Sequence, residues 1–402
     1  MLLLALMALS SGIVQAQADQ LPPMAAVTDR QLTLYNVNGG TQQIMRAEVL
    51  PFDNLVWSTD GQWLAFTAFN AAYQPMLMLT DRSGSAPVSL TSDVHVLPPT
   101  FSDASARIWY AGTPGEQVES SSGLPTFRLD VIAQELRPDA PREVIGQITF
   151  GTGCGGSSPF PMDTVYNIET GFGGSSLVFA NTSGGLLYSH NCAGRGLSLL
   201  NLETGESADL GGGLHGAVVS PDRAQVVALE GNNIIAIDLA SGQRRTHGAQ
   251  VAPDQVAWGA DNDTVYYSVR TLLDTPLPIS DEEAQVMANW TGAPDFSIPQ
   301  YSVSVRSLNL ASGAEQVIYD GPGWAVGRMF TSGGALYFSV VPNGEGWVEA
   351  VASGTLDLSS PEGIFRERAS VSVTMMRVPL GGGEAVEIAQ DIRQATPHPS
   401  AR

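Results

Sequence analysis

The chain has 402 residues, a formal net charge of −21, and 19 basic residues that are all arginine. This acidic balance argues against a nucleic-acid partner or an anionic membrane surface, because both need a basic face. The lack of lysine also excludes Schiff-base and phosphate-loop lysine chemistry. The 43 glycines and 25 prolines indicate many short strands joined by turns rather than long helices.

Residues 1–18, MLLLALMALSSGIVQAQA, form an uncharged and largely apolar stretch that ends in Ala-Gln-Ala. This pattern predicts a secretory signal peptide cleaved after Ala18, although no basic residue precedes the apolar run. A membrane anchor is the weaker alternative, because the run is shorter than the roughly 20 residues that span a bilayer. We therefore expect a protein with no membrane span that is secreted, either extracellular or in the cell envelope or periplasm.

A short pattern recurs along the rest of the chain: an apolar strand, a tight polar turn, and an aromatic or β-branched strand. The copies are NLVWSTDGQWLAFTA (54–68), LPPTFSDASARIWYA (97–111), LVFANTSGGLLYSH (177–190), HGAVVSPDRAQVVAL (215–229), DQVAWGADNDTVYYS (254–268) and VGRMFTSGGALYFS (326–339). Further hairpins with Gly-containing turns lie at 34–44, 77–90, 199–210, 234–246, 305–318 and 375–388. Two hairpins in a period of about 40 residues predict the four-stranded antiparallel blades of an all-β propeller.

The turns of these repeats resemble those of the TolB-like (PD40, WD40-like) β-propeller repeat family. Residues 57–61, Trp-Ser-Thr-Asp-Gly, and residues 219–222, Val-Ser-Pro-Asp, carry the resemblance best. It covers nearly all of residues 28–402 and implies a single propeller domain, but it implies no one function, because such propellers serve many roles. We expect Asp60, Asp222 and Asp261 to stabilise turns, because short Asp side chains bond their own backbone there.

The repeats predict six full blades and a seventh that closes the ring, within a range of six to eight. The closing blade takes its first strand from residues 392–402 and its outer hairpin from residues 31–46, with its second strand unassigned. A blade shared by both ends of the chain leaves no free sheet edge.

The long connecting segments are all expected on one face of the propeller. Strands in a blade alternate in direction, so connections between strands two and three, and between blades, share a face. The long segments 112–125, 150–176, 271–300 and 341–368 are all of these two kinds. Because binding residues concentrate on long loops of a rigid scaffold, we expect this face to bind the ligand.

Two groups of residues in these segments are candidate binding residues. Ser280 and the acidic residues Asp281, Glu282 and Glu283 predict a capped helix over 281–290, with calcium binding as the alternative. The aromatic residues Trp290, Phe296 and Trp347 either bind sugar or peptide or anchor the loops.

Cys154 and Cys192 are the two cysteines of the chain, and we expect them to form one disulfide in an oxidising compartment. A zinc site is the weaker interpretation, because His190 is the nearest further ligand and about four are needed.

The sequence carries no recognisable catalytic motif: neither G-x-S-x-G, nor a phosphate-binding loop, nor H-E-x-x-H occurs. His95, His215 and His398 lie near the starts of inner strands, and a metal site in the central channel is the alternative use for them. The first hypothesis is an exported, non-catalytic, monomeric propeller that binds a protein or cell-envelope glycan through its long loops. The alternative is a metal-dependent lyase or lactonase that acts at the central channel.

Overall fold

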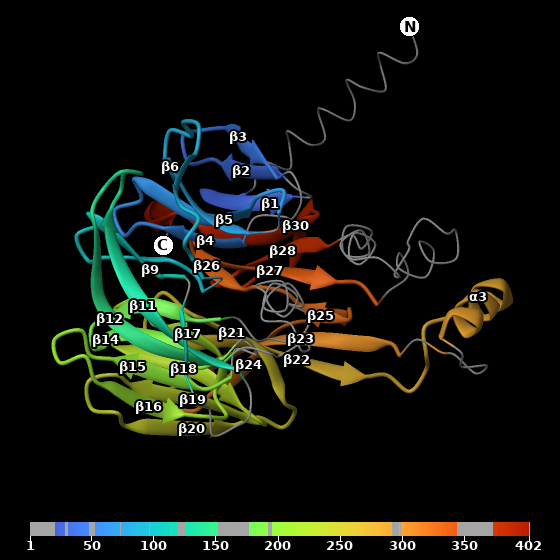
Figure 1. The fold of residues 1–402 in the computed structure, drawn as a ribbon. Helices are drawn as coiled ribbons and strands as arrows, with labels where there is room; N and C mark the ends of the chain where they lie inside the picture. The colour runs from blue at the N-terminus through green and yellow to red at the C-terminus, as the bar shows by residue number, and fades with distance from the viewer. Residues whose placement is uncertain are drawn as a thin grey trace, which may run out of the picture.

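The protein forms seven antiparallel sheets that follow one another around a ring as the blades of a β-propeller (Figure 1). The computed structural model describes residues 21–28, 31–47, 53–72, 74–95, 97–113, 115–118, 125–151, 177–191, 195–291, 297, 299–343 and 373–401. Blades are numbered here in chain order, and blade 7 combines strands from both ends of the chain. The predicted fold class is confirmed.

The first four blades use consecutive strands. Blade 1 contains β4 (Asp53–Trp57), β5 (Trp63–Phe69), β6 (Pro75–Asp81) and β7 (Val88–Thr91). Blade 2 contains β8 (Thr100–Phe101), β9 (Arg107–Ala111), β10 (Glu116–Val118), β11 (Thr126–Glu135) and β12 (Arg142–Gly151). Blade 3 contains β13 (Phe179–Thr182), β14 (Gly185–Ser189), β15 (Leu197–Leu200) and β16 (Ser207–Gly211). Blade 4 contains β17 (His215–Val219), β18 (Gln225–Glu230), β19 (Asn233–Asp238) and β20 (Arg244–Gly248).

The last three blades include the two described helices and the ring closure. Blade 5 contains β21 (Pro253–Trp258), β22 (Thr264–Leu272), β23 (Tyr301–Asn309) and β24 (Glu315–Pro322), with helix α3 (Asp281–Thr291) between β22 and β23. Blade 6 contains β25 (Ala325–Val326), β26 (Phe330–Ser332), β27 (Ala335–Val341), β28 (Thr374–Pro379) and β29 (Val386–Gln390). Blade 7 contains β30 (Ile392–Pro397), β1 (Met24–Thr28), β2 (Gln31–Tyr35) and β3 (Thr41–Arg46), and the 3₁₀ helix η1 (Pro399–Ala401) follows β30.

The repeated Asp turns have the structural role that the sequence predicts. In blade 1 the Asp60 carboxylate accepts hydrogen bonds from the Ser58 hydroxyl at 2.6 Å and from the Gln62 N–H at 3.0 Å. Blade 4 repeats this arrangement with Asp222, which accepts the Ser220 hydroxyl at 2.6 Å. Asp261 in blade 5 accepts the backbone N–H of Thr264 at 2.8 Å. These carboxylates fix the turn between the two inner strands of each blade.

Blade 7 closes the ring by pairing the two ends of the chain. β30 runs antiparallel to β1, with Ala395 opposite Ala26 and Pro397 opposite Met24. The first strand and the outer hairpin lie where the sequence predicts them, and β1 is the second strand that had no assignment. The propeller therefore begins at Met24 rather than at residue 28.

The hydrophobic core is divided into layers between neighbouring blades. In the described part of the chain, each of the seven gaps between adjacent sheets holds its own cluster of buried apolar side chains. The cluster between blades 6 and 7, for example, joins Phe330 and Tyr337 to Met24 and Ala395. Stacking of this kind buries both faces of every sheet, which no blade can do alone. The gap between blades 7 and 1 is filled in the same way, so the ring is closed.

Blade 2 departs most from the predicted repeat. Its outer hairpin, β11 and β12, was not predicted, and β10 lies inside the segment 112–125 that was expected to be a loop. The β11–β12 turn contains Arg-Pro-Asp-Ala rather than glycine, so the turn signal used for the other hairpins is missing. Gln134 holds this turn instead: its buried side-chain amide donates to the Arg137 and Pro138 carbonyls at 3.1 and 3.2 Å.

Candidate functional site: the long-loop face

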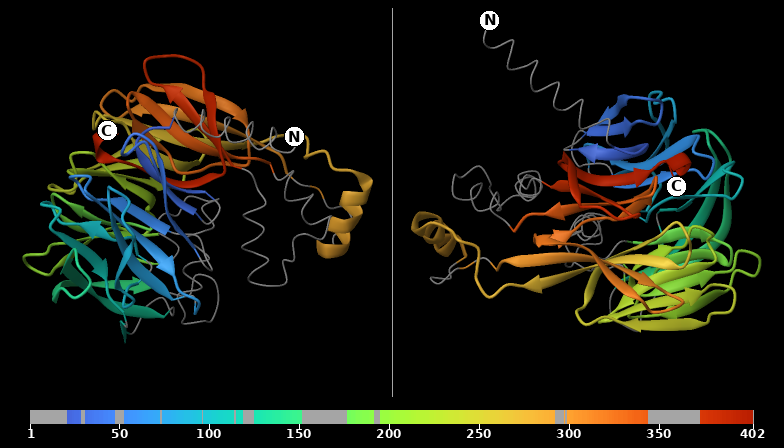
Figure 2. Two further views of the ribbon diagram at one scale, coloured as in Figure 1. Left: turned by 90° about the horizontal axis from the view of Figure 1, so that it is seen from above. Right: turned by 180° about the vertical axis from the view of Figure 1, so that it is seen from behind.

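The described residues that flank the four long segments lie on one face of the propeller, which we call the long-loop face. Residues 112–125, 271–300 and 341–368 each connect the second and third strands of a blade, and residues 150–176 connect blades 2 and 3. The connections on the opposite face, the short-turn face, join strands one to two and three to four. Figure 2 shows α3 standing apart from the blades on the long-loop side.

The most prominent feature of this face is an arm formed by the ends of β22 and β23 and by residues 273–300 between them. The two strands stay paired out to Leu272 opposite Tyr301, and α3 lies beyond that pair (Figures 1 and 2). The Leu272 and Leu273 side chains are exposed near the end of this hairpin, whereas Leu277 is buried. The arm therefore presents exposed apolar side chains as well as a helix whose first turn is acidic.

Helix α3 has the capping box that the sequence predicts. The Glu283 carboxylate accepts hydrogen bonds from the Ser280 N–H and hydroxyl, both at 2.8 Å, and the Glu283 N–H donates to the Ser280 hydroxyl at 3.2 Å. These bonds lower the pKa of Glu283. Asp281 and Glu282 are exposed in the same first turn, where the helix dipole favours negative charge.

Several predicted site residues lie outside the described part of the chain. Phe296, Trp347 and both cysteines, Cys154 and Cys192, fall in undescribed segments, and only the backbone of Trp290, within α3, is described. Their binding roles and the disulfide stay predictions. Of the described residues, Gly151 lies three positions before Cys154 and Asn191 directly precedes Cys192. Gly151 and Asn191 form a parallel β-bridge, with the Gly151 N–H donating to the His190 carbonyl at 2.7 Å.

The root of the arm contains an arginine between two aromatic rings. The Arg270 guanidinium carbon lies 4.8 Å from the centroid of the Tyr301 ring and 5.5 Å from that of the Trp324 ring. The two rings meet edge to face, with centroids 4.9 Å apart. All three side chains are only partly buried. The cluster is thus a rigid surface feature, since the rings and the cation hold one another in place.

Two further residues tie this cluster to neighbouring strands. The buried Asn343 follows β27 and binds Tyr301 twice: its side-chain oxygen accepts the Tyr301 N–H at 2.7 Å, and its amide donates to the Tyr301 carbonyl at 3.0 Å. Asp254, at the start of β21, lies 3.8 Å from the Arg270 Nε. Burial raises the pKa of Asp254, and the nearby Arg270 charge partly opposes this effect. These contacts bring the base of the arm and the start of segment 341–368 to one place.

This root cluster of Arg270, Tyr301 and Trp324 was not predicted as a site. Its members form no sequence motif: Arg270 lies near the end of β22, Tyr301 begins β23, and Trp324 precedes β25. A feature of the sequence that could have pointed to this cluster is the position of Tyr301, which directly follows the long segment 271–300. Tryptophan, tyrosine and arginine are the residues that most often dominate binding energy at protein interfaces, and exposed aromatic faces also stack on sugar rings.

The three candidate metal-binding histidines do not meet. His95 precedes β8 and His215 begins β17, so both lie at the long-loop ends of their blades. His398 follows the end of β30, on the short-turn face, where its Nε2 donates to the Gly61 carbonyl at 2.9 Å. The expectation that His398 lies near a strand start is therefore wrong. Among the described residues, no group of three or more His, Cys, Asp or Glu side chains is placed to hold a metal ion.

His95 is instead packed as a neutral side chain. Its ring meets Phe150 edge to face with centroids 4.7 Å apart, and its Nδ1 is buried without a hydrogen-bond partner. Desolvation by burial lowers the pKa of His95 to about 4. The ring is therefore uncharged at neutral pH.

Comparisons with known proteins identify distant structural matches. No protein-family model and no curated protein matches the sequence. Among solved structures, TolB from Acinetobacter baumannii matches with 11% identity and a TM-score of 0.41, covering 75% of this chain and 63% of that one. A putative 6-phosphogluconolactonase from Bacteroides fragilis matches with 13% identity and a TM-score of 0.47, covering 92% and 94%. Oligogalacturonate lyase from Vibrio parahaemolyticus matches with 10% identity and a TM-score of 0.46, covering 81% and 89%.

The seven antiparallel blades of the structure are the architecture that the predicted resemblance to TolB-like propellers implies. The matching structures include TolB and two proteins named as enzymes, and this chain spans less than two thirds of the A. baumannii TolB chain. At such low identities, function does not transfer between propellers. None of the helices in the described ranges combines the length and apolar character that crossing a bilayer requires.

Proposed function

We propose that this protein is an exported, non-catalytic β-propeller that binds a protein or a cell-envelope glycan through its long-loop face. The observation that carries the proposal is that the described residues flanking the long segments lie on one face, where the partly exposed Arg270, Tyr301 and Trp324 cluster stands at the root of the arm. Export rests on the signal-peptide pattern of residues 1–18.

The residue types of this face suit recognition better than chemistry. An aromatic pair clamped by a cation loses little conformational freedom on binding, which favours affinity. The alternative function, a metal-dependent lyase or lactonase, needs several side chains that bind one metal ion. His95 and His215 lie at the opposite end of the blades from His398, so no observation favours that alternative.

Deleting the arm should abolish binding and leave the propeller folded. Because the Leu273 N–H already donates to the Gln300 carbonyl at 2.9 Å, replacing residues 274–299 by Asn-Gly should close the arm as a two-residue hairpin. Shortening a loop costs little stability by itself, but the deletion also removes the buried Leu277 side chain, so the free energy of unfolding should fall by no more than about 5 kcal/mol. The measurement is recovery of envelope proteins and glycans from an extract of the producing cell by the immobilised intact and arm-deleted proteins.

The matched control is an insertion of five Gly and Ser residues after Ser312, in the β23–β24 turn of the same blade. Ser312 is exposed, the turn lies on the short-turn face, and Gly313 has open space around it. The insertion variant should recover the same ligand as the intact protein. Retention of the ligand by the arm-deleted protein, together with its loss from the insertion variant, would overturn the proposal.

A further inference from the structure

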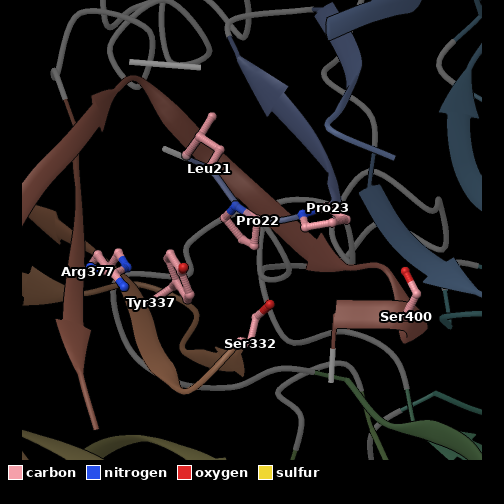
Figure 3. Close-up of a pocket in the computed structure, with 8 residues that line it drawn as sticks. Leu21, Pro22, Pro23, Ser332, Tyr337, Arg377 and Ser400 are labelled. Atoms are coloured by element: carbon pink, nitrogen blue, oxygen red, sulfur yellow. The ribbon is translucent and has the colours of Figure 1, made fainter. Parts of the chain in front are cut away.

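A pocket on the short-turn face, far from the arm, has the features of a separate small-molecule site. It has a volume of about 480 Å³ and lies at the seam between blades 6 and 7. Its lining, drawn in Figure 3, comprises Leu21, Pro22, Pro23, Ser332, Gly333, Tyr337, Arg377 and Ser400. The volume falls within the range of roughly 300–1,000 Å³ that is typical of ligand pockets.

The apolar rim of the pocket is held in place from both ends. The Leu21 carbonyl accepts a hydrogen bond from the Asn36 side-chain amide at 2.7 Å, and the Pro23 carbonyl accepts the His398 N–H at 2.8 Å. Leu21 is itself buried in the cluster between blades 6 and 7, and the proline rings restrict the backbone between these anchors. The pocket is therefore preformed, which lowers the entropy lost on binding.

The polar wall of the pocket is a cross-strand pair. Tyr337 on β27 lies directly opposite Arg377 on β28, and Figure 3 shows the two side chains next to each other. The Tyr337 ring is buried and stacks on Phe330, with centroids 5.3 Å apart and planes 10° apart. The phenol hydroxyl and the guanidinium are thus presented together by two paired strands.

Arg377 is a partly buried residue with no anionic partner within the described ranges, where its guanidinium forms no hydrogen bond or ion pair. Other arginines differ: Arg107 lies 2.6 Å from the Glu143 carboxylate, and Arg142 lies 2.8 Å from that of Asp93. On its other side Arg377 faces Val386 of β29 rather than an acid. A partly desolvated cation beside proline and leucine is stabilised by a bound anion.

We propose that this pocket binds a small organic carboxylate. The Arg377 guanidinium pairs with the carboxylate, the Tyr337 hydroxyl donates a further hydrogen bond, and Leu21, Pro22 and Pro23 contact the apolar part of the ligand. A carboxylate fits better than an uncharged ligand, because only a charged acceptor compensates the unpaired guanidinium.

Benzoate, with benzamide as its uncharged counterpart, is the probe for this site. Titration calorimetry and ligand-observed NMR on the full chain should show that benzoate binds and that benzamide binds at least about tenfold more weakly. Substitution Arg377→Gln should weaken benzoate binding about 10- to 100-fold. Loss of a hydrogen bond to a charged group typically raises the dissociation constant by about that factor. Arg377→Lys should retain part of the affinity, because it keeps the charge but loses the planar fork.

The control substitution is Arg244→Gln, at an exposed arginine of blade 4, which should leave benzoate binding unchanged. The arm-deleted protein should also bind benzoate normally, so failure of the arm proposal and failure of this one are distinguishable. Equal binding of benzoate and benzamide, or unchanged benzoate binding by a folded Arg377→Gln protein, would overturn the inference. Failure of the intact chain to bind benzoate at millimolar concentrations would overturn it as well.

Discussion

A chain that ends at Asp391 should have a free energy of unfolding at least about 5 kcal/mol lower than that of the intact protein. This truncation removes β30, the first strand of blade 7, and leaves one edge of β1 unpaired while its other edge stays paired with β2. Loss of the buried Ile392 side chain alone should cost about 2–5 kcal/mol, and each unpaired backbone group of β1 adds about 1 kcal/mol. Urea unfolding followed by intrinsic fluorescence measures the change.

The control for this truncation is a chain that ends at Ser400, which keeps β30 and the His398 bonds to Gly61 and Pro23. The control should unfold at nearly the same urea concentration as the intact protein. The cluster between blades 6 and 7 includes Ile392 and Ala395, so its loss should also expose Phe330 and Tyr337 and promote aggregation. Equal stability of the two truncated chains would contradict closure of the ring by both termini.

Acidification from pH 7.5 to pH 4.5 should destabilise the intact protein by about 2 to 3 kcal/mol through His95 alone. The folded protein holds the His95 pKa at about 4, below its ordinary value of 6.5, so the unfolded chain binds more protons between these two values. The stability is fully present above pH 6.5 and is lost as the pH falls toward 4. The magnitude follows from about 1.36 kcal/mol per pKa unit.

The measurement is the urea unfolding free energy at both pH values for the intact protein and for His95→Gln. Burial also lowers the pKa values of His190, His247 and His398, so the variant should still lose stability on acidification. Its loss should be smaller than that of the intact protein by the His95 contribution. A second substitution, His95→Leu, separates loss of the titrating group from loss of packing against Phe150. Identical pH dependence in all three proteins would show that His95 is not held neutral by the fold.

Much of the fold could be predicted because its turns carry a local chemical signal. Ser58 and Asp60 bond one another and the adjacent backbone within five residues, and Gly61 takes a positive φ of 68°. A Cβ at Gly61 would also lie 2.6 Å from the His398 ring, so the turn and the closing strand constrain the same position. The bonds of Ser58 and Asp60 within the turn can be predicted from the sequence, because their partners lie within five residues of one another.

The parts that sequence analysis missed depend on contacts between distant residues. β1 is too short and too uniformly apolar to show a repeat, and only its pairing with β30 identifies it. The β11–β12 turn depends on Gln134, whose carbonyl oxygen also accepts the Tyr110 hydroxyl at 2.9 Å across the sheet. The Arg270 cluster and the Arg377 pocket likewise bring together residues from different strands, and no spacing along the chain marks them.

The capping box shows the limit of local prediction at the candidate site. Ser280 and Glu283 correctly predict the start of α3, because both partners lie within one helical turn. The helix does not by itself reveal the root of the arm, where Asn343 holds Tyr301 from 42 residues away. The binding surface is therefore a property of the folded ring rather than of any one segment.

The most direct test of the account is to tether the protein to a surface in two opposite orientations. One protein carries a biotin label on a cysteine at Ser312→Cys, on the short-turn face, and the other on a cysteine at Asp274→Cys, in the arm; both positions are exposed. With equal amounts immobilised, the Ser312→Cys protein should capture its ligand from an envelope extract, and the Asp274→Cys protein should capture little or none. Capture by the arm-tethered protein and not by the other would contradict the long-loop face as the binding surface.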